Sequence, residues 1–183
     1  MAIKTFTTGE VLTAADTNTY LANSGLVFVK SQTIGSGVTS VTVSNAFSAT
    51  YDNYRILVNT TGSLAQSIGC RLDGSSTAYA QFVIYGDLGS NAVLGFQQTS
   101  GSEFRFVGGS SSTSNSSIAC FDLLNPFAAA YTRMPSGPYF ESNSMGTSNG
   151  EHRVATSYTG LVIVSGNGTF TGGTITVYGY RKA

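Results

Sequence analysis

Residues 168–183 read GTFTGGTITVYGYRKA, and this stretch decides the fold. Polar or tyrosine residues alternate along it with aliphatic residues, a period of two that is typical of a β-strand with one buried face. One side of the strand carries Thr174, Thr176, Tyr178 and Tyr180, and the other carries Ile175 and Val177. We therefore predict that the chain ends on a strand whose aliphatic side faces the core.

The chain before this strand carries similar patterns from residue 26 onward. With the closing strand included, we predict strands at residues 26–33, 39–43, 51–59, 68–72, 79–87, 93–98, 104–107, 117–123, 153–158, 161–164 and 174–180. Successive strands without intervening helices are typical of a β-sandwich or barrel. The predicted fold is all-β, an antiparallel β-sandwich of the jelly-roll type that spans residues 26–183 and follows a short N-terminal helix.

Four of the predicted strands carry apolar residues spaced two apart, which we expect to face inward. These sets are Tyr54, Ile56 and Val58; Phe82 and Ile84; Phe104 and Phe106; and Phe121 and Leu123. Turns are predicted at four pairs of residues that tolerate positive φ, namely Asp73-Gly74, Gly108-Gly109, Asn149-Gly150 and Gly172-Gly173. The low-complexity run 108–117 and the proline-containing stretch 125–150 are expected to be surface loops.

The composition favours a folded domain that assembles with other proteins. Among the 183 residues, nine basic residues match nine acidic ones, so no basic field exists to bind nucleic acid or an anionic membrane surface. Eleven Phe, ten Tyr and a hydrophobic fraction of 41% are more than a disordered chain carries. A formal net charge of zero removes the repulsion that keeps many proteins apart. We expect a homo-oligomer, with a trimer as the specific prediction.

Helix signals occur only within residues 1–25. Thr13 is a suitable N-cap, and Asp16 stands three residues later as in a capping box, with a helix expected to continue to Ala22. A helix of this length is marginal alone in water, so its apolar residues should pack on another surface. We predict that residues 1–25 form a docking segment, whose contact residues are Val11, Leu12, Tyr20 and Leu21.

Few residues point to chemistry. His152 is the one histidine, and no Gly-x-Ser-x-Gly elbow supplies a serine partner, so we interpret His152 as a surface residue beside a turn. Cys70 and Cys120 lie in predicted strands, where a buried free thiol is commoner than a disulfide. One histidine and two cysteines do not make a zinc cluster. We predict no catalytic residue, no metal and no cofactor, while distant acids such as Asp87 and Glu103 leave glycoside cleavage open.

The beginning of the chain, MAIKTFTTGEV, carries no apolar stretch of signal-peptide length. No segment approaches the roughly 20 apolar residues that a membrane span needs. We therefore expect synthesis in a cytoplasm and no insertion into a membrane.

The tyrosines invite a binding role because each combines an apolar ring with a polar hydroxyl. They suit a carbohydrate-stacking surface or contacts between subunits, and the absence of Trp favours subunit contacts. The candidate surface residues are Tyr131, Tyr139, Tyr178 and Tyr180.

The opening FTTGEVLTAADTNTYLANSGLVFV, residues 6–29, resembles the N-terminal segment of many small structural proteins of tailed bacteriophages. In that segment a phrase Gly-x-Val-Leu-Thr-Ala is followed, after a short gap, by Asn-x-Tyr-Leu. Here the phrase falls on Gly9, Val11, Leu12, Thr13, Ala14, Asn18, Tyr20 and Leu21. The closing GGTITVYGYRK is also similar to the last strand of phage tail and virion β-sandwich proteins.

This resemblance implies a virion protein that is made in the host cytoplasm. The first expectation is a tail-fibre or tail-tip component that docks by its N-terminus to other virion proteins and faces a glycan or protein on the host surface. The alternative is a capsid decoration, or cement, protein that braces capsomers. An enzyme that degrades surface polysaccharide is the minor alternative.

Overall fold

The computed structural model describes residues 7–16, 25–110, 116–141 and 143–182 and shows an all-β protein of sandwich character, as predicted. A single turn of helix, α1 (Ala14–Asp16), precedes the strands. The strands are β1 (Leu26–Ile34), β2 (Ser40–Val43), β3 (Asn53–Gly62), β4 (Ser67–Leu72), β5 (Tyr79–Asp87), β6 (Ala92–Gly101), β7 (Phe104–Gly109), β8 (Ser116–Leu124), β9 (Thr132–Glu141), β10 (Ser144–His152), β11 (Leu161–Ser165) and β12 (Phe170–Tyr180).

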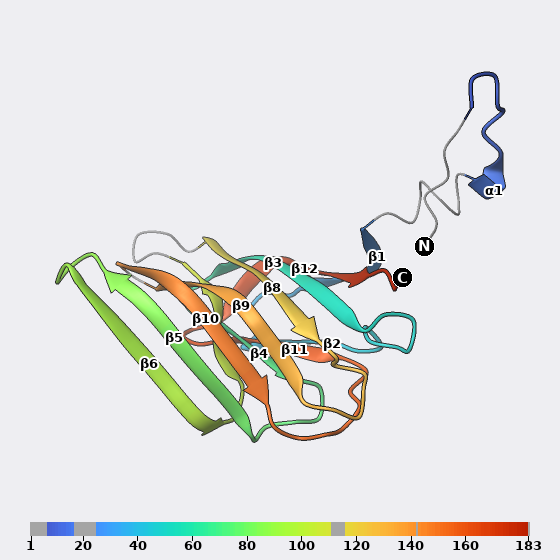
Figure 1. Ribbon diagram of the computed structural model, residues 1–183. Coiled ribbons are helices and arrows are strands. Elements are labelled where there is room, and N and C mark those ends of the chain that lie inside the picture. The colour runs from blue at the N-terminus through green and yellow to red at the C-terminus, as the bar shows by residue number, and fades with distance from the viewer. Residues whose placement is uncertain (1–6, 17–24, 111–115, 142, 183) are drawn as a thin grey trace.

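The strands join one antiparallel sheet that curls back on itself. Its main path runs β2-β11-β4-β7-β8-β9-β10-β5-β6, and β3, β12 and β1 form a branch that continues from β8. Figure 1 shows β8, β9, β10, β5 and β6 as successive strands with β6 at the outer edge, and β4, β11 and β2 behind them. The sheet therefore supplies both layers of the fold.

The main core lies between the branch and the layer formed by β4, β11 and β2. Val58 of β3 and Val177 of β12 belong to one buried cluster with Leu72 of β4 and Ile163 of β11. All four side chains are at most 1% exposed. Burial of apolar surface contributes roughly 25 cal/mol per Å², so this cluster is the principal favourable term that holds the two layers together.

The closing strand behaves as its sequence predicts. Ile175 and Val177 are fully buried, whereas Thr174 is exposed and Tyr178 is half-buried. β12 occupies a central place in the branch, between β1 and β3. The last strand therefore completes the core by pairing on both of its edges.

The predicted turn at Gly172-Gly173 is wrong, because both glycines lie inside β12. The register of β12 against β3 shifts between Phe170 and Gly172. Gly173 has φ +132°, and a Cβ atom there would lie 2.2 Å from the carbonyl oxygen of Asn59. Only glycine fits this position, because its backbone is in a region that L side chains rarely adopt and its neighbour leaves no space for one.

Residues 125–158 depart most from the expectation. In place of a surface loop, this part of the chain holds the hairpin of β9 and β10, and the predicted strand at 153–158 is not formed. Asn149 and Gly150 lie within β10 and not in a turn. The inward side of β10 carries two buried polar residues, Ser148 and His152. A search for alternating apolar residues therefore does not detect this strand.

Glycine pairs at the other predicted turns have different outcomes. Gly108 and Gly109 lie in β7, where they pair with β4 and β8. Asp73 and Gly74 do form the predicted turn, with Gly74 at φ +83°. Gly108 and Gly109 are required because neighbouring strands pack closely there, whereas Gly74 is required because its φ is positive. A glycine pair in the sequence does not show which of these two requirements applies.

The inward sets on β3, β7 and β8 are buried as predicted, but the set on β5 is not. Phe82 and Ile84 are 48% and 46% exposed, and the alternate residues Gln81 and Val83 are buried. The Gln81 side chain donates from Nε2 to the carbonyl oxygen of Phe106 (3.0 Å) and to Ser148 Oγ (2.6 Å). These bonds compensate the burial of the Gln81 amide. The face of β5 that carries Gln81 therefore points inward, and Phe82 and Ile84 point outward.

Both cysteines are free thiols, as expected. Cys70 is buried in the core, and Cys120 is exposed on β8, which corrects the expectation that both would be buried. Burial raises the pKa of the Cys70 thiol far above its ordinary value, so this thiol stays protonated. Across the described residues, no helix has the length and apolar character needed to cross a membrane.

Candidate binding surfaces

The predicted docking segment exposes two apolar side chains. Val11 is 78% exposed and Leu12 is 48% exposed, and Figure 1 shows residues 7–16 apart from the sheets. The capping box is formed: the Asp16 amide donates to Thr13 Oγ1, and the Thr13 amide donates to Asp16 Oδ2, both at 3.1 Å. Tyr20, like the predicted continuation of the helix after residue 16, lies outside the described residues, and so does Leu21.

The four candidate tyrosines do not form one surface. Tyr131 is exposed just before β9, and Tyr178 and Tyr180 are half-buried on one side of β12. Tyr139 is only 5% exposed and packs against the rings of Phe106 and Tyr85, with centroid distances of 5.1 and 4.9 Å. Tyr139 therefore builds a second core cluster and is corrected as a surface candidate.

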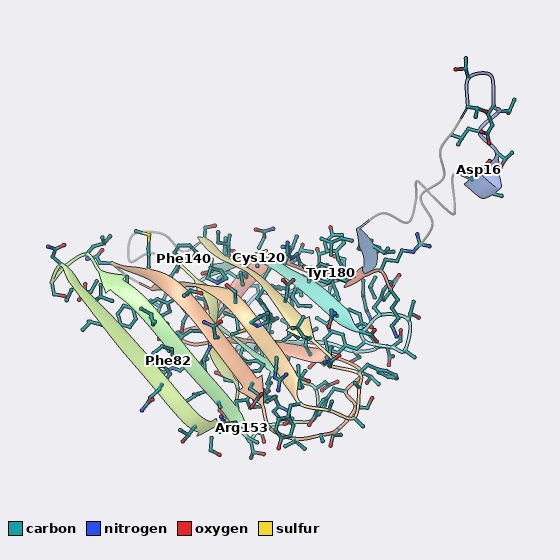
Figure 2. The ribbon with its side chains drawn as sticks, viewed as in Figure 1. Asp16, Phe82, Cys120, Phe140, Arg153 and Tyr180 are labelled. Carbon is teal, nitrogen blue, oxygen red and sulfur yellow. The ribbon has the colours of Figure 1, made fainter. Side chains whose placement is uncertain are left out.

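Tyr180 belongs to a polar cluster on the outer side of the branch. Its hydroxyl donates to Asp122 Oδ1 (2.8 Å), and the guanidinium of Arg55 donates to both carboxylate oxygens of Asp122. Burial alone would raise the pKa of Asp122, but the bonds from Arg55 and Tyr180 outweigh it and hold that pKa below its usual value. Burial, together with the Asp122 carboxylate, raises the pKa of Tyr180 to about 12. Figure 2 shows where Tyr180 and Cys120 lie on this part of the sheet.

His152 is fully buried, which corrects its interpretation as a surface residue. Its Nε2 atom lies 2.8 Å from Ser75 Oγ, and the rings of Tyr79 and Tyr158 lie against it at centroid distances of 4.4 and 5.3 Å. Burial lowers the pKa of His152, so its ring is neutral at neutral pH. In a catalytic site, a serine beside a neutral histidine can act as the nucleophile with the histidine as its base. Here aromatic rings enclose His152, so we interpret His152 as a packing residue of the core.

An open groove of about 480 Å³ lies on the outer face of β5, β6, β9 and β10. The antiparallel register places Asn149 of β10 and Gln97 of β6 directly on either side of the exposed Phe82 ring. The groove volume lies within the roughly 300–1,000 Å³ that small-molecule sites commonly occupy. We call this feature the Phe82 groove.

Charged residues stand at one end of the Phe82 groove. Arg133 and Arg153 each donate from Nε to Glu151, at 2.9 and 3.3 Å respectively. The bond from Arg133 contributes more than the bond from Arg153, and together they hold the pKa of Glu151 below its usual value. Two arginines and one glutamate give this end a local net charge of 2 − 1 = +1. Figure 2 shows Phe82 on β5 and Arg153 beyond the end of β10.

Farther along the same face lies a cluster of exposed apolar side chains, Ile84, Val93 and Met145. The register places Val93 and Met145 on either side of Gly86, two residues after Ile84 on β5. Together these three residues form what we call the apolar patch. Such patches on folded proteins commonly mark surfaces that contact another molecule.

Neither the Phe82 groove nor the apolar patch was predicted from the sequence. β5 carries apolar residues on both faces, so the sequence does not show which face is exposed. One feature of the sequence does indicate an exposed apolar side chain here. Val93 and Leu94 are adjacent in β6, so each face of this strand carries one of these apolar residues. No group of three His, Cys, Asp or Glu side chains within the described part of the chain is placed to hold a metal ion.

Comparisons of the chain with protein-family models, with curated proteins and with solved structures gave no match. The candidate surfaces are therefore interpreted from their own geometry and chemistry.

Proposed function

We propose that the protein is a structural component of a tailed-phage virion, a tail-fibre or tail-tip protein that docks by its N-terminal segment and turns its β-body toward the host. One observation carries this proposal: Val11 and Leu12, inside the phrase that resembles phage proteins, are exposed on a segment apart from the sheets. Full burial of such a side chain against a partner gains about 1.5–3 kcal/mol. Docking onto another virion protein is a role that this exposed pair suits.

The body of the protein offers a second contact surface. The apolar patch is exposed in a single copy of the chain. The formal net charge is zero, so charge repulsion does not oppose the association of copies. We propose that copies of the chain join through this patch as a homotrimer. Burial of Ile84, Val93 and Met145 between copies would remove their apolar surface from water.

Particle assembly tests the docking role. Particles would be assembled in host cells that supply either the native chain or the double variant Val11→Asp with Leu12→Asp. A carboxylate at a buried contact is strongly unfavourable, so we expect the variant to fold normally and to be lost from purified particles. The matched control is Leu64→Asp, which changes another exposed leucine in the body of the protein.

Two results would contradict the proposal. One is incorporation of the double variant at the native copy number, and the other is absence of the native chain from purified particles. Gold labelling of the particles then separates a tail position from a capsid position, which distinguishes a fibre component from the alternative decoration protein.

A further inference from the structure

We propose that the Phe82 groove binds an acidic oligosaccharide, with a sugar ring on Phe82 and a carboxylate at the Arg133 and Arg153 end. This inference deepens the proposed function, because it names the chemical class of ligand that a host-facing body would contact. It concerns a surface that is separate from the docking segment and can be tested on the free protein.

Phe82 provides the platform. Its ring lies on the outer face of the sheet, is 48% exposed and lines the groove. A pyranose ring has an apolar face of C–H groups, which packs on an aromatic ring, and hydroxyl groups around its edge, which need polar partners. An exposed phenylalanine with polar neighbours meets both requirements.

The polar partners stand on both sides of the platform. Asn149 and Gln97 are directly opposite Phe82 on the neighbouring strands, and both side chains are exposed. Each side-chain amide offers one acceptor oxygen and two N–H donors, so it can bind a sugar hydroxyl group that acts either as donor or as acceptor. Within the described residues, neither amide is engaged by another side chain, so both are available to a ligand.

The charged end selects the kind of sugar. Arg133 and Arg153 both donate to Glu151 from Nε, and in the described part of the chain their terminal nitrogens form no further bond to protein. Guanidinium groups bind carboxylates in a fork geometry. The local charge of two arginines and one glutamate, +1, favours a uronic or other carboxylate-bearing sugar over a neutral one.

Isothermal titration of the full-length protein with tetragalacturonate and with maltotetraose tests this proposal. These probes have the same number of sugar rings but differ in charge. We expect tetragalacturonate to bind and maltotetraose to bind at least about tenfold more weakly, corresponding to the loss of one charge-assisted contact. Added salt should narrow this difference.

Variants locate the site. Phe82→Ala and, separately, Gln97→Ala should each weaken binding of tetragalacturonate, Phe82→Ala by about tenfold or more. Arg133→Gln with Arg153→Gln should remove the preference for the acidic probe. Phe28→Ala and Arg105→Gln, which change exposed residues of the same types outside the groove, should bind like the native chain.

Three results would overturn the proposal: no binding of tetragalacturonate, equal binding of both probes, or binding that survives both Phe82→Ala and Gln97→Ala. Incorporation into particles is measured with the Val11 and Leu12 variant, so failure of the glycan site and failure of virion docking are distinguishable. Urea unfolding of each variant establishes that it is folded before it is titrated.

Discussion

Arg55 and Asp122 form a bidentate ion pair across two neighbouring strands, with Nε–Oδ1 and Nη2–Oδ2 distances of 2.9 Å each. They are 67 residues apart in sequence and directly opposite in the register of β3 and β8. A shift of one residue in that register would move one partner to the core face. The pair therefore links electrostatics to the alignment of the two central strands.

We predict that Arg55→Met and Asp122→Asn are coupled by about 0.5–1 kcal/mol in a double-mutant cycle measured by urea unfolding. The side chains are 37% and 22% exposed, so solvent screens the pair and limits its energy. The more exposed pair of Arg133 and Glu151 serves as the control and should show a smaller coupling. Additive effects of Arg55→Met and Asp122→Asn would show that the contact does not contribute to stability.

The two sides of β12 should differ sharply in their tolerance of substitution. Ile175→Ala is expected to reduce the free energy of unfolding by about 2–4 kcal/mol, because it removes buried carbon atoms and leaves a cavity. Thr174→Ala, its exposed neighbour, should cost less than about 1 kcal/mol through lost strand propensity. Urea denaturation of both variants checks this, and equal losses would mean that both faces of the strand are buried.

Gly173→Ala is expected to be among the most damaging small substitutions in the chain. Its φ of +132° is strained for alanine, and the added Cβ atom would lie 2.2 Å from the Asn59 carbonyl oxygen. We predict a loss of about 3 kcal/mol or more, as for other positions where strain and a steric clash combine. Gly35→Ala is the control outside the apolar patch, because a Cβ atom there would have no neighbour within 4 Å. Similar melting of the two variants would refute this explanation.

His152 should make the protein less stable in mild acid. Burial lowers its pKa in the folded state, so the unfolded state binds a proton more readily. The stabilisation by neutral His152 is present above the ordinary pKa of about 6.5 and is lost as pH falls below it toward the folded-state pKa.

This pH dependence is measured by urea unfolding between about pH 7.5 and 5, where His152 titrates in the unfolded state. His152→Gln should lose the corresponding part of the slope, whereas Ser75→Ala, which keeps the histidine, should retain it. The same pH slope in the native chain and in His152→Gln would exclude this residue as the cause.

Sequence patterns predicted those parts of the fold where burial and apolarity coincide. Ile175 and Val177 alternate with polar neighbours, and the Thr13 and Asp16 capping box depends only on local geometry. β10 escaped prediction because its inward residues include Ser148 and His152, which are buried through specific polar and aromatic contacts. Such contacts come from distant strands and leave no apolar period in the sequence.

The candidate surfaces depended even more on long-range pairing. β5 has an apolar residue on each face at successive positions, and the buried hydrogen bonds of Gln81 decide that Phe82 points outward. The Phe82 groove then arises because β6 and β10 bring Gln97 and Asn149 to the same row. No local motif records that juxtaposition.

Assembly through the apolar patch is tested most directly by the mass of the full-length protein in solution. Light scattering is expected to give the mass of three copies of the 19.0 kDa chain, and the triple variant Ile84→Ser, Val93→Ser and Met145→Ser is expected to give one copy. Phe28→Ser with Ile118→Ser, which changes two exposed apolar residues outside the patch, should keep the native mass. A native chain that stays monomeric, or a patch variant that keeps the oligomer, would contradict assembly through this patch.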